Sequence, residues 1–387
     1  MRSNMNGLVR RCSAIFMGLI FLFGAGQVAA ETIKIGAILA VTGPASFLGG
    51  PEVRSLKMLV DEVNASGMAG GHTIELIVKD SGASSEKAVS FAKQLIEEEQ
   101  VFAIIGPSTS GETFKIKRLC DRSKTILISC GSAELIVNPV APFVFKTAPS
   151  DSLAARKIFT AMQGMDIDKI AVLTGNTGFG KAGKKQITDI APQYGIEIVE
   201  ADVYDKKATD LSAIVAKIKA NKDVEAVINW SIVPAQSIIA KNIRQIGWDV
   251  PLFQSHGFAN IKYVKAAGAA AEGIIFPASR LIVADSLPDG PRKEFLMDYK
   301  TAYETRFKED VSTFGGHSYD AMMILAKAIA EVGPDKMKVR TAIENMKGYF
   351  GTAGEFNFSA EDHSGLRIDA FTMVTVKDGV FVPYSME

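Results

Sequence analysis

Short apolar runs alternate with amphipathic stretches along most of the chain. The apolar runs have the length and β-branched content of buried strands, and the stretches between them repeat their apolar residues at helical spacing. This alternation is typical of βαβ units with a parallel sheet. The first series has predicted strands at residues 33–39, 73–79, 101–105 and 125–129, with predicted helices at 52–65 and 86–98.

A second series of the same kind follows residues 147–150. Its predicted strands are 169–174, 196–203, 224–230 and 251–254; three helices (291–307, 316–332 and 338–346) and a β-rich tail (354–383) follow. The pattern predicts an α/β protein with two doubly wound parallel-sheet lobes. Ligands of open α/β sheets bind beyond the carboxyl ends of the strands, so two such edges facing each other predict a cleft. The loops expected to line it are 42–50, 106–111, 129–134, 175–180, 230–234 and 255–260.

Residues 1–30 differ from the rest of the chain. Arg2, Arg10 and Arg11 flank the start of an apolar stretch at 14–23, and Val28-Ala29-Ala30 supplies small residues before Glu31. The stretch is shorter than the roughly 20 residues that span a bilayer. We expect a signal peptide that is cleaved after Ala30, and export to the periplasm. No lipid anchor is expected, because no cysteine stands at the cleavage point.

Composition and charge indicate a globular protein and argue against a nucleic-acid-binding one. The chain has 387 residues, of which 47% are hydrophobic and 22% charged, as in ordinary globular proteins. Removing the three arginines of the signal segment from a chain with 43 basic and 43 acidic residues leaves a formal net charge of −3. Nucleic acid is therefore not an expected partner.

A glycine-rich segment supports a competing interpretation. Gly178-x-Gly180-x-x-Gly183 follows a predicted strand and opens a predicted helix, which is the context of a dinucleotide fingerprint. As a phosphate loop the segment fails at Ala182, where a hydroxyl should reach magnesium. An exported nucleotide-dependent enzyme is thus the first alternative, and glycines that shape a turn at the cleft are the other reading. Because nucleotide cofactors are scarce outside the cytoplasm, we expect no enzyme and no cofactor.

Hydroxyl groups gather in a second loop. Residues 106–111 read Gly-Pro-Ser-Thr-Ser-Gly ahead of a helix expected near Glu112, and they lack the Gly-x-Ser-x-Gly elbow of a serine nucleophile. The loop is suited to a carboxylate at a helix N-terminus. Capping of the helix by Ser108 or Ser110 is an equally good reading.

Histidines and cysteines indicate no metal site. The four histidines are far apart and lack helical pair spacing. Cys120 and Cys130 are expected late in a helix and at the end of the next strand. An oxidising compartment permits a bridge between them, and buried free thiols are the alternative.

At these residues the chain resembles the leucine/isoleucine/valine-binding family of type I periplasmic solute-binding proteins. The resemblance rests on Thr42-Gly43-Pro44, Ile105-Gly106-Pro107-x-x-Ser110, Tyr319-Asp320-Ala321, and Phe356-x-Phe358 followed by Asp362-His363-x-Gly365. It implies two lobes joined by a three-segment hinge, with crossings near 146–152, 276–280 and 356–366. The implied domains are lobe 1 at 31–148 and 278–360, and lobe 2 at 149–277 and 361–387.

The resemblance also implies a ligand site. Ser110 matches the serine that holds the ligand carboxylate, and 131–133 matches a loop that binds the ligand through its backbone. In that loop Ala133 replaces the family's threonine, and Ser132 offers the one hydroxyl. The expected ligand-binding residues are Phe47, Leu48, Ser108, Ser110, Gly131, Ser132, Phe179, Trp230, His256 and Phe314, with core packing as the alternative for each aromatic.

One departure from the family concerns the ligand. His256 stands where a family glutamate binds the ligand's ammonium group. The expected ligand is an amino acid or a related small carboxylate. His256 favours a carboxylate that has an aromatic or apolar body and lacks an ammonium, and an amino acid is the alternative if Glu112 or Glu134 supplies the charge. The resemblance implies a monomer that delivers this ligand to the permease and ATPase of an ABC importer. A ligand-sensing subunit for a signalling receptor is the second alternative.

Overall fold

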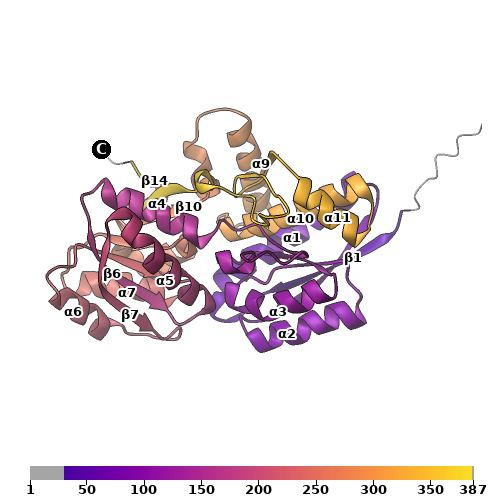
Figure 1. The fold of residues 1–387 in the computed structure, drawn as a ribbon. Coiled ribbons are helices and arrows are strands. Elements are labelled where there is room, and N and C mark those ends of the chain that lie inside the picture. The colour runs from indigo at the N-terminus through magenta and orange to yellow at the C-terminus, as the bar shows by residue number, and fades with distance from the viewer. Residues whose placement is uncertain (1–29, 386–387) are drawn as a thin grey trace, which may run out of the picture. The chain divides into compact units, whose positions relative to one another are not determined.

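The computed structural model describes residues 30–385, so the predicted signal peptide lies outside the described residues except for Ala30. Glu31–Glu387 form one compact unit. Its first sheet, which contains the strand labelled β1 in Figure 1, is parallel and has the order β2-β1-β3-β4-β5. The strands are β1 (Thr32–Leu39), β2 (Thr73–Asp80), β3 (Ala103–Ile105), β4 (Ile126–Ser129) and β5 (Val144–Lys146).

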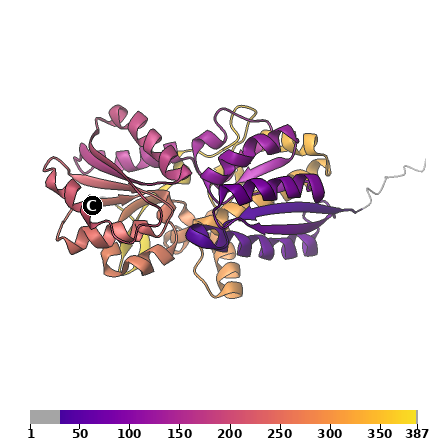
Figure 2. The same cartoon turned by 90° about the horizontal axis from the view of Figure 1, so that it is seen from below.

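Helices lie on both sides of the first sheet, as Figure 2 shows. They are α1 (Ser46–Ser66), α2 (Ser85–Lys93), α3 (Ser110–Arg122), α10 (Thr313–Val332) and α11 (Lys336–Asn345). Successive side chains of a strand point to opposite faces. Accordingly Ile35 and Ala37 of β1 pack with α1 and α10, whereas Ile38 packs with α2 and α3. Such burial on both faces explains why the strands read as continuous apolar runs.

The second sheet has the order β14-β13-β10-β9-β8-β6-β7. Its strands are β6 (Lys169–Gly175), β7 (Glu197–Tyr204), β8 (Ala226–Trp230), β9 (Leu252–Gln254), β10 (Ile275–Ala278), β13 (Thr372–Lys377) and β14 (Val380–Pro383). The β13 strand runs antiparallel to β10, and β14 runs antiparallel to β13. The second sheet is therefore mixed, whereas the sequence pattern predicted a parallel sheet. Its helices are α4 (Asp151–Gln163), α5 (Gly178–Ile190), α6 (Ser212–Ala220), α7 (Ala235–Gln245) and α8 (Ile261–Ala267).

The chain passes from one sheet to the other three times. The β5 strand is followed by α4 and the second sheet, and β10 is followed by α9 (Pro291–Phe307), α10 and α11. After the short pair β11 (Tyr349–Phe350) and β12 (Glu355–Phe356), the chain returns to the second sheet at β13.

Core contacts favour one change to the predicted domain boundaries. Leu366 and Ala370 pack in the core of the first sheet, and Phe371 packs in the core of the second. Because 361–370 had been expected in the second lobe, we propose that the last boundary lies near residue 370 instead of 360. The other boundaries stay predictions.

In the part of the chain that the structure describes, no helix combines the length and the hydrophobicity needed to cross a bilayer.

Candidate functional site

A small cavity lies where the loops of the two lobes meet. We call it the inner cavity; its volume is about 20 Å³. All of the predicted ligand-binding residues except Phe47 and Trp230 line it. The lining residues are Leu48, Ser108, Thr109, Ser110, Cys130, Gly131, Ser132, Ala148, Phe179, Ile232, His256, Gly257, Phe314 and His317.

Phe47 and Trp230 do not line the inner cavity. The Phe47 ring packs against Tyr263 at 5.0 Å between centroids, and its carbonyl oxygen accepts a hydrogen bond of 2.7 Å from Asn260 Nδ2. Trp230 is fully buried behind Phe179 and stacks on it at 5.6 Å. Trp230 therefore supports the wall, and Phe47 contacts the second lobe.

Two serines on the first-lobe wall have different partners. Ser110 Oγ accepts a hydrogen bond of 3.2 Å from Ala133 N, so its own hydroxyl hydrogen remains available to the cavity. Ser108 Oγ accepts from Ala40 N at 2.9 Å and is also bonded to Glu52 Oε2. Burial raises the pKa of Glu52 to about 8, so this carboxyl keeps its proton at neutral pH. Ser108 is therefore occupied by structural contacts.

The cap of α3 is neither of these serines, so the capping alternative for Ser108 or Ser110 is wrong. Thr109 is the N-cap residue, and its side chain accepts from Glu112 N. Its hydroxyl also donates to Glu112 Oε2 at 2.5 Å. Capping satisfies one of the free N–H groups at the helix start and leaves Ser110 at the first helical position.

A buried lysine lies behind the loop at 131–133. Lys146 is fully buried, and its Nζ donates to Ala148 O at 2.7 Å and to Ser132 O at 3.4 Å. Burial lowers the pKa of Lys146 to about 8, which leaves it largely protonated at neutral pH. Within residues 30–385 it forms no ion pair. The carboxylates of Asp151, Glu134 and Asp362 act against this lowering of the Lys146 pKa and balance part of its charge. An anion bound near Ser132 would stabilise the cation further.

Aromatic rings surround the His256 side chain in the second lobe. Its ring lies 5.2 Å from Phe179, 5.6 Å from Trp230 and 5.3 Å from Phe371, between centroids. Neither ring nitrogen has a hydrogen-bond partner among the described residues. Burial lowers the pKa of His256 to about 3, and repulsion from Lys146, and from His317 when that ring is protonated, contributes to the lowering. The imidazole is therefore neutral and offers one donor and one acceptor.

His317 was missed by sequence reasoning. It lines the inner cavity from α10, its Nδ1 has no partner in the described chain, and burial lowers its pKa to about 3. It follows Phe314 by three residues, and residues at this spacing lie on the same helix face. That spacing was the signal that could have found it.

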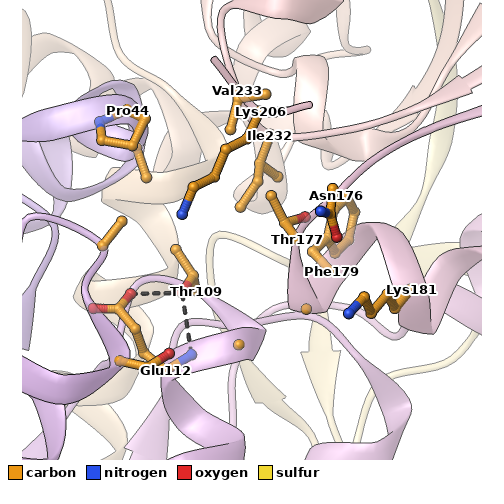
Figure 3. A pocket seen from close by; sticks show the side chains of 15 residues that line it. Pro44, Thr109, Glu112, Asn176, Thr177, Phe179, Lys181, Lys206, Ile232 and Val233 are labelled. Carbon is orange, nitrogen blue, oxygen red and sulfur yellow. Dashed lines mark hydrogen bonds between the residues drawn. The ribbon is translucent and has the colours of Figure 1, made fainter. Parts of the chain in front are cut away.

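A larger chamber of about 190 Å³ adjoins the inner cavity (Figure 3). We call it the outer chamber; Thr109, Phe179 and Ile232 line both spaces. Its other lining residues are Pro44, Ala45, Ala83, Ser85, Gly111, Glu112, Asn176, Thr177, Gly178, Lys181, Lys206 and Val233. Glu112 thus faces the cleft, whereas Glu134 lines neither space and accepts a hydrogen bond from Asn138.

Packing accounts for the glycines of the apparent dinucleotide fingerprint. A Cβ atom at Gly178 would lie 2.4 Å from Gly111 Cα, and one at Gly180 would lie 1.9 Å from Gly175 O. At Gly183 it would lie 2.0 Å from Trp230 Nε1. The Thr177 side chain caps α5 by accepting from Gly180 N. Close approach of neighbouring groups therefore explains the pattern without a nucleotide.

The two cysteines of the described chain are not bridged. Cys120 and Cys130 are buried free thiols, which was the alternative to a disulfide bridge between them. Across the described residues, no three His, Cys, Asp or Glu side chains are grouped as metal ligands would be.

The chain is similar to known proteins in both sequence and structure. The sequence profile of the periplasmic binding protein family matches residues 32–380. The leucine-, isoleucine-, valine-, threonine-, and alanine-binding protein of Pseudomonas aeruginosa is 23% identical over 338 residues, which cover 86% of this chain and 88% of the relative.

Solved structures share the fold. The substrate binding protein LivJ of a branched-chain amino acid transporter from Streptococcus pneumoniae, in complex with isoleucine, superposes with a TM-score of 0.80 at 25% identity, covering 90% of this chain and 97% of that one. A solute binding protein of an ABC transporter from Rhodopseudomonas palustris, in complex with 3,4-dihydroxy benzoic acid, gives 0.78 at 19% identity, covering 90% and 95%. The chain therefore belongs to the periplasmic binding protein family.

Proposed function

We propose that this protein captures a small carboxylate with an aromatic or apolar body and no ammonium group, and delivers it to the permease of an ABC importer. The observation that carries the proposal is His256. It is a neutral ring in the cavity wall, and both of its nitrogens lack partners within the described chain.

The carboxylate is assigned to the first-lobe wall. Ser110 has a free hydroxyl hydrogen, because its oxygen already accepts from Ala133 N. Lys146 adds a positive charge behind Ser132, because its Nζ donates a hydrogen bond to the carbonyl oxygen of Ser132. Hydrogen bonds to a charged partner are about twice as strong as neutral ones, so this wall favours an anion.

An ammonium group has no suitable partner in the inner cavity. None of the described residues that line it is an aspartate or a glutamate. A charge that leaves water without a paired acceptor is very costly. The neutral His256 and His317 instead suit a carbonyl, hydroxyl or carboxylate oxygen. An amino acid would therefore bind poorly here.

The body of the ligand is assigned to the apolar walls. Leu48, Phe179, Ile232 and Phe314 surround the cavity, and aromatic rings bury large apolar areas with defined geometry. The two solved relatives carry isoleucine and 3,4-dihydroxy benzoic acid, so one fold accepts both kinds of ligand. The second kind agrees with the side chains found in this cavity.

Capture requires the lobes to separate. The inner cavity, at about 20 Å³, is little larger than the space one water needs. Contacts between the lobes include Asn260 with Phe47 O, and an ion pair of 3.0 Å between Lys262 and Glu309. We infer that these contacts break for ligand entry and that the lobes move by hinge closure.

A thermal-shift panel tests the proposal. We expect benzoate, phenylacetate or branched 2-oxo acids to raise the melting temperature, because a ligand that binds only the folded state stabilises it. Leucine, isoleucine, valine and phenylalanine should have little effect. The proposal is wrong if leucine or valine stabilises the protein and none of the amine-free acids does.

A further inference from the structure

We propose that His317 joins His256 in binding the ligand, and that the group they hold is an oxygen on the carbon atom next to the carboxylate. The inference rests on the proposed function, in which the carboxylate of the same ligand lies against Ser110. It names the class of ligand more narrowly, as 2-oxo or 2-hydroxy acids.

Both histidines carry nitrogen atoms without partners in the wall of the inner cavity. His256 begins a short 3-10 helix (His256–Phe258) of the second lobe, and His317 lies in the first turns of α10 in the first lobe. They are only 6% and 4% exposed. Neither ring nitrogen of His256, nor Nδ1 of His317, has a hydrogen-bond partner among residues 30–385. A buried polar atom without a partner is unfavourable, so a ligand group that bonds to both rings would be stabilised.

The contacts that position the His317 ring do not use this nitrogen. The ring lies 6.0 Å from that of Phe314 between centroids, in an edge-to-face arrangement. The carbonyl oxygen of His317 accepts a hydrogen bond of 2.8 Å from Thr147 Oγ1, which fixes this turn of α10 beside the first crossing between the lobes. Packing and backbone contacts therefore orient the imidazole and leave Nδ1 without a partner in the fold.

The charges around the cavity favour an oxygen as the bound group. Burial lowers the pKa of both His256 and His317 to about 3, and repulsion from Lys146 contributes in each case. Both rings are therefore neutral at pH 7, and each offers one N–H donor and one acceptor nitrogen. An oxo oxygen can accept from both rings, and a hydroxyl group can accept from one ring and donate to the other. An ammonium group would meet the positive charge of Lys146 instead.

The size of the cavity places this oxygen beside the carboxylate. The space of about 20 Å³ is close to that of one water molecule, and Ser110, His256 and His317 all line it. A ligand group that contacts both histidines is therefore separated by only a bond or two from the group that contacts Ser110. In a carboxylic acid, carbon 2 is the position that meets this condition. A CH₂ group at carbon 2 would fill the same space and leave both rings without a partner.

Calorimetry with phenylpyruvate and 3-phenylpropanoate tests the inference, because these acids differ only in the oxo group on carbon 2. The wild-type protein should bind phenylpyruvate at least about tenfold more tightly, since the other acid leaves buried nitrogens without partners. His317→Phe keeps an aromatic ring without nitrogens and should bind the two acids with similar affinity. His72→Phe is the matched control and should keep the preference, because His72 is also buried but accepts from Glu31 N, outside the cavity.

The outcomes separate this inference from the proposed function. If the wild-type protein binds both acids equally, or if His317→Phe keeps the preference, the inference is wrong while the proposed function stands. If His317→Phe binds neither acid, His256→Phe decides by the same comparison: similar affinities support the inference, and a retained preference overturns it. If the wild-type protein binds neither acid, the inference is wrong; the proposed function then stands if benzoate binds, and is wrong as well if phenylalanine alone binds.

Discussion

At the scale of single residues, Ser108 and Ser110 separate structure from binding. Ser110→Ala should weaken ligand binding by roughly 1.5 to 3 kcal/mol, because it removes a hydrogen bond to a charged group. Ser108→Ala is the matched control: it removes contacts to Ala40 N and Glu52, and should lower the free energy of unfolding instead. Calorimetry and urea unfolding measure the two effects. Full affinity in Ser110→Ala would place the carboxylate elsewhere.

Glu52 predicts a pH dependence of stability. Its pKa is about 8 in the folded protein and 4.5 ordinarily, so between these values the folded state binds one proton more than the unfolded state. Its contribution is fully present below pH 4.5 and is lost as the pH rises through 8. Glu52→Gln mimics the protonated acid and should abolish this loss.

Urea unfolding at pH 5.5 and 8.5 provides the measurement. As the pH rises from 5.5 to 8.5, the free energy of unfolding of Glu52→Gln should increase relative to that of wild type by roughly 1 to 3 kcal/mol. Lys146 titrates in both proteins and cancels in the comparison. An identical pH profile for variant and wild type would show that Glu52 is ionised throughout.

Single site residues were predictable only where the family resemblance assigns a role to their position in the chain. Family resemblance located Ser110, Gly131 and His256, which the structure places around one cavity. It gave no reason to select Lys146, because no periodicity marks a polar side chain that is buried by a distant segment, and His317 was missed although its helical spacing from Phe314 places both on one face. Whether these residues bind a ligand remains a prediction.

At the scale of elements, the starts of α3 and α5 approach each other across the cleft. A methyl group at Gly178 would lie 2.4 Å from Gly111 Cα, whereas one at Gly111 would lie 3.4 Å from Gly178 N. Gly178→Ala should therefore hinder closure and weaken binding about tenfold or more, with little change in unfolding free energy. Gly111→Ala should be nearly neutral. Equal affinities in both variants would refute this closure contact.

Most elements were predictable because apolar periodicity sets them. The predicted helix at 291–307 coincides with α9, and the remaining predicted strands and helices were located to within a few residues, except that α1 begins at Ser46 instead of 52. The antiparallel direction of β13 was not predictable, since alternation of side chains carries no information about strand direction. The cap at Thr109 was missed because Ser108 and Ser110 have the same capping chemistry.

At the scale of the whole molecule, two lobes and three crossings follow from the repeated βαβ pattern together with the family resemblance. The sequence alone did not reveal how small the inner cavity is, because this depends on side chains from both lobes. Leu48 and Phe314, from outside the second sheet, pack with the core cluster of that sheet. Ligand entry therefore involves separation of apolar surfaces as well as polar contacts.

The central claim is that the site selects against an ammonium group. Titration calorimetry with phenylpyruvate and phenylalanine tests it most directly, because the two acids differ only in the oxo or ammonium group at the α-carbon. We expect phenylpyruvate to bind at least about a hundredfold more tightly, since the inner cavity leaves an ammonium without a charged acceptor. Tighter binding of phenylalanine would contradict the account.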